Sequence, residues 1–116
     1  MKISEIYERV LPLEKTCSIR EAIDTILCAN VSLLPVVDEG KRYLGIVTLR
    51  GLVAAYRNEE ASASVETCLE TGIPVIAEDS DFGDVPAAVD RFVVTDAEGN
   101  VVGVITPTRL VRSLLD

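Results

Sequence analysis

The 116-residue sequence contains no histidine and no tryptophan, and only 4% of its residues are aromatic. Without histidine, the chain cannot build a Ser-His-Asp or Cys-His catalytic centre or a histidine-based zinc site. It also has no Gly-rich phosphate loop of the Walker type. We therefore expect a protein that is not an enzyme, with a core filled by valine, isoleucine, leucine and alanine.

Long apolar runs, paired cysteines and clustered positive charge are also absent. No apolar run approaches the ~18–20 residues of a membrane helix, and the first residues lack the apolar segment of a signal peptide. The three cysteines, Cys17, Cys28 and Cys68, include no Cys-x-x-Cys motif, which argues against a disulfide framework. A net charge of −8 with scattered basic residues argues against nucleic-acid binding. We expect a cytoplasmic protein without membrane or nucleic-acid partners.

The sequence does contain a repeated stretch. Two short apolar runs between Leu33 and Val47 flank a polar, Gly-containing turn, which predicts a β-hairpin. Thr48 stands where the N-cap of a following helix is expected. The pattern returns later, since Gly103-Val104-Ile105-Thr106 matches Gly45-Ile46-Val47-Thr48 at an offset of 58 positions (103 − 45). Pro107 then favours a helix start, which predicts a final helix over 107–115.

The segments before the hairpins also match. Ser18 and Glu21 have the spacing of a capping box, and the apolar residues from Ile19 to Leu27 predict an amphipathic helix that Asn30 ends. Ahead of each copy we predict a short helix and then a brief extended segment. These are a helix over Ile3–Val10 with an extended segment at 11–13, and a helix over Val65–Leu69 with an extended segment at 73–75.

Each half therefore contains a short helix, strand, helix, strand, strand and helix. The connection through a helix predicts a parallel strand pair, and the hairpin an antiparallel pair. The polar stretch 59–64 reads as a linker, so we place one repeat at 1–60 and the other at 61–116, with one shared core. The second copy has lost four residues from its first helix. That helix should span about two turns from an N-cap at or near Asp84.

With Leu34-Pro35-Val36-Val37-Asp38 ahead of the first Gly-x-x-Thr motif, the chain resembles a pair of CBS (cystathionine-β-synthase) domains, a Bateman module, over essentially its whole length. The resemblance implies an α/β (α+β) fold of two tandem βαββα repeats with pseudo-twofold symmetry. It implies a regulatory domain in signalling whose clefts bind an adenine nucleotide such as AMP, ADP or ATP, or S-adenosylmethionine. It also implies a homodimer. The end of the chain at Asp116 fits both a standalone protein and a module with a downstream output domain.

The resemblance implies two ligand clefts between the repeats. At Thr48 and Thr106 a hydroxyl and free backbone N–H groups suit a phosphate, although both threonines could equally serve only as N-caps. The first cleft would use Pro12, Leu13, Val31, Ser32, Thr106, Thr108 and Arg109. The second, weaker cleft would use Ile73, Pro74, Val75, Thr48, Arg50 and Gly51.

One departure from the family pattern affects both clefts. Such proteins usually carry an aspartate three residues after the threonine, where this chain has Gly51 and Arg109. Glycine offers no acceptor and arginine only donates, so the usual ribose contact is missing, while Arg109 could hold a phosphate or carboxylate. Two main hypotheses follow. The chain is either a ligand-sensing module for an anionic, nucleotide-like metabolite or a structural, dimerising module with degenerate clefts. A pocket for a non-nucleotide anion stands between the two.

Overall fold

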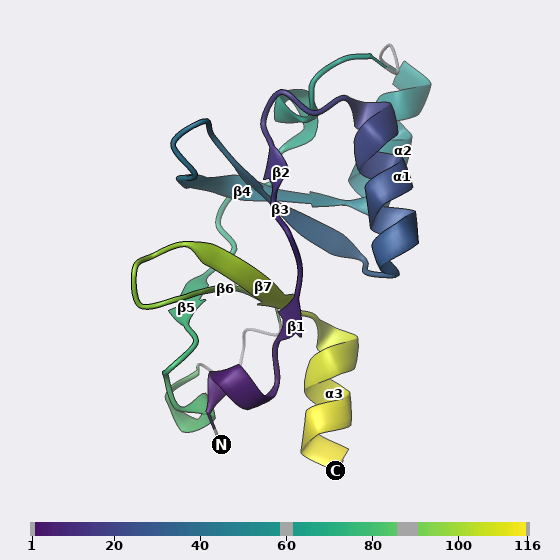
Figure 1. Ribbon diagram of the computed structural model, residues 1–116. Helices are drawn as coiled ribbons and strands as arrows, with labels where there is room; N and C mark the ends of the chain where they lie inside the picture. The colour runs from purple at the N-terminus through teal and green to yellow at the C-terminus, as the bar shows by residue number, and fades with distance from the viewer. Residues whose placement is uncertain (1, 59–61, 86–90, 116) are drawn as a thin grey trace.

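The computed structural model describes residues 2–58, 62–85 and 91–115 (Figure 1). These residues form two small β-sheets, with α1 and α2 beside the first sheet and α3 beside the second. The first sheet has the order β2 (Leu13–Glu14), β3 (Leu33–Val37), β4 (Tyr43–Thr48). The second has the order β1 (Glu8–Arg9), β7 (Val101–Ile105), β6 (Phe92–Thr95), β5 (Val75–Ala77). The helices are α1 (Ile19–Ala29), α2 (Leu49–Asn58) and α3 (Pro107–Leu115), with 3₁₀ turns η1 (Ile3–Glu5), η2 (Val65–Cys68) and η3 (Phe82–Asp84).

Strand pairing follows the repeated pattern. β2 and β5 each pair in parallel with the first strand of a hairpin, and each hairpin, β3–β4 and β6–β7, is antiparallel. The main apolar cluster joins the two sheets, because Val93 and Val104 of the second pack with residues such as Leu34 and Ile46 of the first. These findings confirm the mixed α/β fold and the predicted pairings. The main cluster spans both halves, as predicted, but a second cluster is separate from it and consists of Ile3, Ile6, Phe92, Val94 and Ile105.

The two hairpin turns are built alike. One carboxylate oxygen of Asp38 accepts the N–H groups of Gly40 and Arg42, and Asp96 likewise accepts those of Glu98 and Asn100, all at 2.8–2.9 Å. These bonds, led by that from Asn100, hold the pKa of Asp96 below its usual range. The turns differ at the left-handed position, which is Lys41 (φ 65°) in the first and Gly99 (φ 86°) in the second.

The predicted boundaries of α1 are confirmed. The Ser18 hydroxyl accepts the Glu21 N–H at 3.1 Å and donates to the Glu21 carboxylate, also at 3.1 Å. Asn30 takes the left-handed conformation that ends the helix (φ 56°, ψ 44°). Because Ile19, Ala22 and Ile26 are fully buried, the amphipathic face holds α1 against the first sheet.

The predicted helix over Ile3–Val10 is wrong beyond its first turn. Ile3, Ile6 and Val10 are buried, as their spacing suggests, but the helical turn η1 ends at Glu5. The chain then extends as β1, which pairs antiparallel with β7, and the Val10 N–H donates to the Val102 carbonyl at 3.3 Å. Pairing with a distant strand overrides the local helical spacing. The first ten residues therefore leave the second sheet and cross to the first (Figure 1).

The segment that opens the second half crosses in the opposite direction. Ser64 forms an antiparallel bridge with Ser18, and Glu70 forms one with Ile46 of the first sheet. The two halves thus exchange their leading segments, while the boundaries 1–60 and 61–116 stay a prediction. Residues 59–61 of the expected linker, and the two-turn helix expected after Asp84, fall outside the described residues. Within the described part, the acid that caps a helical turn is Asp81, whose carboxylate accepts the Gly83 N–H at 2.9 Å.

Among the helices of the described residues, none is both long and apolar enough to cross a bilayer.

Candidate functional site

Two Gly-x-x-Thr junctions lead from a hairpin into a helix. At the first, the Thr48 hydroxyl accepts the Gly51 N–H at 3.0 Å and caps α2. At the second, the Thr106 hydroxyl accepts the Arg109 N–H at 3.3 Å and caps α3. Both threonines are therefore N-caps, as predicted. Each junction also starts its helix beside a crossing segment, with Thr48 bonded to Glu70 and Arg109 bonded to Ile6.

The glycines of these motifs make room for the exchanged segments. A Cβ added to Gly103 would lie 2.3 Å from the Glu8 carbonyl oxygen and 2.4 Å from the Tyr7 ring. A Cβ on Gly45 would lie 2.7 Å from the Glu70 carbonyl oxygen. Because only glycine permits so close a backbone approach, each motif fixes the segment that crosses it. Each crossing segment thereby brings one glutamate, Glu8 or Glu70, to a Gly-x-x-Thr junction.

At the first junction the glutamate is already bonded. The Thr48 hydroxyl donates to the Glu70 carboxylate at 3.0 Å, and a Cβ on Gly51 would lie 3.7 Å from the same carboxylate. Thus an internal anion already stands beside the start of α2, where a carboxylate is favoured. Of the other residues predicted for this cleft, Ile73 packs on the main core, Pro74 and Val75 are exposed, and Arg50 lies on the outer surface of α2.

At the second junction an open cleft of about 450 Å³ remains, which we call the Arg109 cleft. It lies where the start of α3 meets the loop after α1 and the start of α2. Its lining residues are Glu8, Asn30, Val31, Ser32, Leu49, Thr106, Arg109 and Arg112.

Two hydrogen bonds position the polar residues and the backbone that line this cleft. The Arg109 Nε donates to the Ile6 carbonyl oxygen at 3.1 Å, which ties the guanidinium to the exchanged N-terminal segment. The Leu49 N–H donates to the Ser32 carbonyl oxygen at 3.2 Å, which ties the loop after α1 to α2. Arg112 follows Arg109 by one turn of α3 and is exposed. Two guanidinium groups and a helix N-terminus form an environment that attracts an anion.

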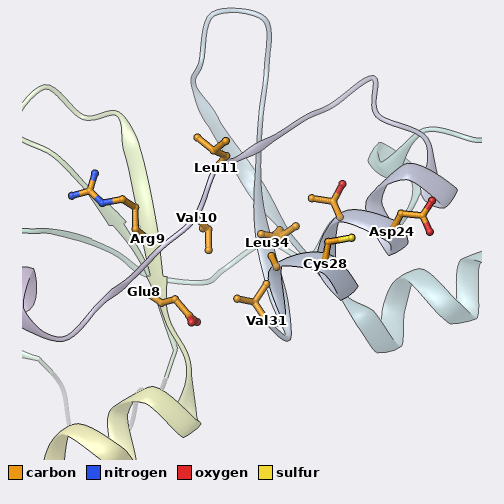
Figure 2. Close-up of a pocket in the computed structure, with 10 residues that line it drawn as sticks. Glu8, Arg9, Val10, Leu11, Asp24, Cys28, Val31 and Leu34 are labelled. Atoms are coloured by element: carbon orange, nitrogen blue, oxygen red, sulfur yellow. The ribbon is translucent and has the colours of Figure 1, made fainter.

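An apolar hollow of about 600 Å³ adjoins the Arg109 cleft, and Glu8 and Val31 line both. Figure 2 shows Val10, Leu34 and Val31 gathered at its centre, Cys28 on α1 and Leu11 at the edge. The remaining lining residues are Arg9, Asp24, Thr25 and Ala29. The hollow and the cleft are thus neighbours that share two lining residues, the hollow mainly apolar and the cleft cationic.

Four of the predicted first-cleft residues meet in the Arg109 cleft: Val31, Ser32, Thr106 and Arg109. Pro12 and Leu13 do not. They line a separate hollow with Glu14 and Thr16, and Leu13 is buried beneath it. Thr108 lies in the first turn of α3, but its side chain is outside the described part of the structure.

The sequence interpretation missed Glu8, Asn30, Leu49 and Arg112. Arg112 had a visible signal, because it follows Arg109 by three positions on a predicted helix. Glu8 had only a weak one, since Glu70 occupies the matching place ahead of the second repeat, at an offset of 62 (70 − 8). Among the described residues, no group of three or more Cys, Asp or Glu side chains is arranged to hold a metal ion.

Comparisons with known proteins agree with this architecture. The family model of the CBS domain matches residues 3–58. An uncharacterized 17.7 kDa protein of Acidianus ambivalens is 27% identical over 99% of this chain and 74% of its own length.

Two solved structures share the fold over nearly the whole chain. CBSX2, solved in complex with AMP, has a TM-score of 0.76 at 20% identity and covers 98% of this chain and 96% of its own. A CBS domain pair/ACT domain protein of Thermotoga maritima has a TM-score of 0.74 at 16% identity, with 99% and 97% covered. Residues 3–58 thus match the CBS domain, and the chain has the fold of a CBS domain pair along its length.

Proposed function

We propose that this chain is a ligand-sensing regulatory module that binds an adenine nucleotide or a similar anionic metabolite in the Arg109 cleft. The observation that carries the proposal is the convergence of Thr106, Arg109 and Arg112 at the start of α3, beside an apolar hollow. Phosphate groups suit the cationic part, and a flat apolar base suits the hollow. The AMP complex of CBSX2, a protein of the same fold, supports the choice of nucleotide.

The electrostatics favour this cleft over the other junction. The chain as a whole carries a net charge of −8, yet Arg109 and Arg112 outnumber the one carboxylate, Glu8, in the lining of the cleft. At Thr48 the corresponding space is taken by the Glu70 carboxylate, which would repel a phosphate. We therefore expect one strong nucleotide site per chain.

A thermal-shift titration of the full chain tests the proposal, with AMP, ADP, ATP, S-adenosylmethionine and inorganic phosphate as probes. A ligand at 100 times its Kd should stabilise the protein by about 2.7 kcal/mol, which is a rise of roughly 10 °C in Tm for a domain of this size. Arg112→Ala should leave the Tm of the free protein unchanged, because Arg112 is exposed, and weaken binding about tenfold.

The matched control is Arg57→Ala, which removes an exposed arginine from the last turn of α2, away from the lining of the cleft. It should bind as the unmodified chain does. A folded protein that none of the probes stabilises would overturn the proposal. If the Arg112→Ala and unmodified proteins bind a probe with equal affinity, the probe does not bind in this cleft.

The second candidate function is a structural, dimerising module, and exposed apolar side chains favour it. Val111, Leu114 and Leu115 of α3 are 52%, 61% and 82% exposed, and Leu27 and Tyr56 of the α1–α2 layer are 60% and 47% exposed. Such surfaces mark association sites, so we propose a homodimer as well. Light scattering after size exclusion tests it. Leu114→Glu should yield a monomer if α3 is the interface, whereas Leu11→Glu, a control at 86% exposure, should not.

A further inference from the structure

Glu8 stands at the boundary between the two parts of the site. It lines both the Arg109 cleft and the apolar hollow, so a ligand that fills both must pass its carboxylate. Figure 2 shows Glu8 extending from β1 toward the side on which Val31 lies, while Arg9 points to the opposite side of the strand. Glu8 is the one carboxylate in the lining of the Arg109 cleft, whose other side chains are either positively charged or uncharged.

The backbone of Glu8 is held firmly in place. Glu8 pairs with Val104 in the second sheet, and its carbonyl oxygen lies against Gly103, where no side chain intervenes. The next residues are fixed as well, because the Val10 N–H donates to the Val102 carbonyl at 3.3 Å. The carboxylate therefore starts from a rigid position in the site.

The matching glutamate shows what a carboxylate on a crossing segment can do. Glu70 lies against Gly45 as Glu8 lies against Gly103, and its carboxylate accepts a hydroxyl, that of Thr48, at 3.0 Å. At the second junction the Thr106 hydroxyl instead accepts the Arg109 N–H. Within the described residues, the Glu8 carboxylate has neither a hydrogen bond nor an ion pair, so its acceptor sites face the cleft unused.

We propose that Glu8 is a specificity-determining residue that accepts hydrogen bonds from neutral hydroxyl groups of the ligand. The inference rests on the proposed function and narrows the ligand class. A carboxylate repels an anion placed beside it and favours O–H donors. The favoured ligand therefore carries an apolar ring for the hollow, a hydroxyl-bearing middle at Glu8 and an anion at the arginines. A phosphorylated ribonucleoside has this order of groups, and inorganic phosphate does not.

Isothermal titration calorimetry separates the contributions of the ribose hydroxyls and of the phosphate to affinity. The three probes are AMP, 2′,3′-dideoxy-AMP, which lacks both ribose hydroxyls, and inorganic phosphate. Glu8→Ala should weaken AMP about tenfold, and it should bind the dideoxy analogue and phosphate two- to threefold more tightly, because a repelling charge is gone. Glu8→Gln keeps one acceptor oxygen, so its loss for AMP should be smaller, about threefold.

The control is Glu14→Gln, which neutralises one exposed carboxylate on β2, outside the linings of the cleft and the hollow. It should leave the affinities for all three probes within twofold. Unfolding curves of the Glu8 variants should match the parent, which excludes a loss of structure as the cause of weaker binding.

Two other outcomes would overturn the inference. If Glu8→Ala tightens AMP and phosphate alike, Glu8 only repels anions; if it weakens AMP and dideoxy-AMP equally, Glu8 only shapes the cleft. In both cases nucleotide binding by the parent chain, and hence the proposed function, would still stand. If the parent chain binds none of the probes, the proposed function fails, and this inference fails with it.

Discussion

The two Gly-x-x-Thr junctions share one backbone design and differ in the chemistry that it carries. In both, a glycine lies under a crossing segment and a threonine caps a helix. At Thr48 the carboxylate of Glu70, from the crossing segment, accepts the threonine hydroxyl. At Thr106 two arginines and Glu8 instead line an open cleft. The comparison shows that both repeats keep the same backbone crossing at the Gly-x-x-Thr junction. Whether the junction forms a ligand site depends on the few side chains that surround it.

The largest expected difference between the junctions is at the glycines. Gly103→Ala should destabilise the protein by about 2–3 kcal/mol, because its Cβ would lie within 3.0 Å of both the Glu8 backbone and the Tyr7 ring. Gly45→Ala should lower the free energy of unfolding by less, about 1–2 kcal/mol, because its Cβ would lie within 3.0 Å of only one atom, the Glu70 carbonyl oxygen. Urea unfolding of both variants measures the difference. A larger loss for Gly45→Ala would show that the crossing at the first junction is the more rigid one.

The threonine hydroxyls give the next largest effect. Thr→Ser keeps the hydroxyl and Thr→Ala removes it, so the difference between the two variants isolates the cap. At Thr48 this difference should be about 1–2 kcal/mol, because the hydroxyl bonds both Gly51 and Glu70 at 3.0 Å. At Thr106 it should be about 0.5–1 kcal/mol, because the one bond described is longer, at 3.3 Å. Equal differences in thermal unfolding would mean that the Glu70 bond adds nothing.

At the hairpin turns the two matching positions should respond in opposite directions, and Lys41→Gly should give the smallest effect of all. Lys41 adopts a left-handed conformation that the matching Gly99 adopts without strain. Lys41→Gly should therefore stabilise the protein by about 0.5 kcal/mol after the added chain entropy is offset. Gly99→Ala should destabilise it by about 1 kcal/mol. Denaturant midpoints of the two variants check this pair, and a loss of stability in Lys41→Gly would contradict it.

Local signals were sufficient for most of the fold. The hairpins, the Ser18 and Thr caps, the end of α1 at Asn30 and the span of α3 follow from turn residues, caps and apolar spacing within a few positions. These features are decided by neighbours in sequence. For the same reason the repeat can be recognised from the amino-acid sequence alone.

What failed depended on contacts between distant segments. The spacing of Ile3, Ile6 and Val10 suits a helix as well as it suits the observed turn and strand, and only the pairing of β1 with β7 decides between them. The same crossing brings Glu8 into the site, so the prediction of a helix over Ile3–Val10 leaves Glu8 outside it. Pro12 and Leu13, which the resemblance implies for the first cleft, line a different hollow, and Leu13 pairs with Val36 in the first sheet.

The exchange of leading segments also has a consequence for synthesis of the chain on the ribosome. β1 is made well before its partner β7, because Glu8 pairs with Val104, 96 positions later (104 − 8). The residues of β1 must therefore stay unpaired until β7 has emerged. Contacts of such sequence separation form slowly because a long loop must close first. During that interval the first sheet, β2–β3–β4, can assemble from segments already present. Pairing of β1 with β7 would then follow the assembly of the first sheet, and it would complete the second sheet and the Arg109 cleft together.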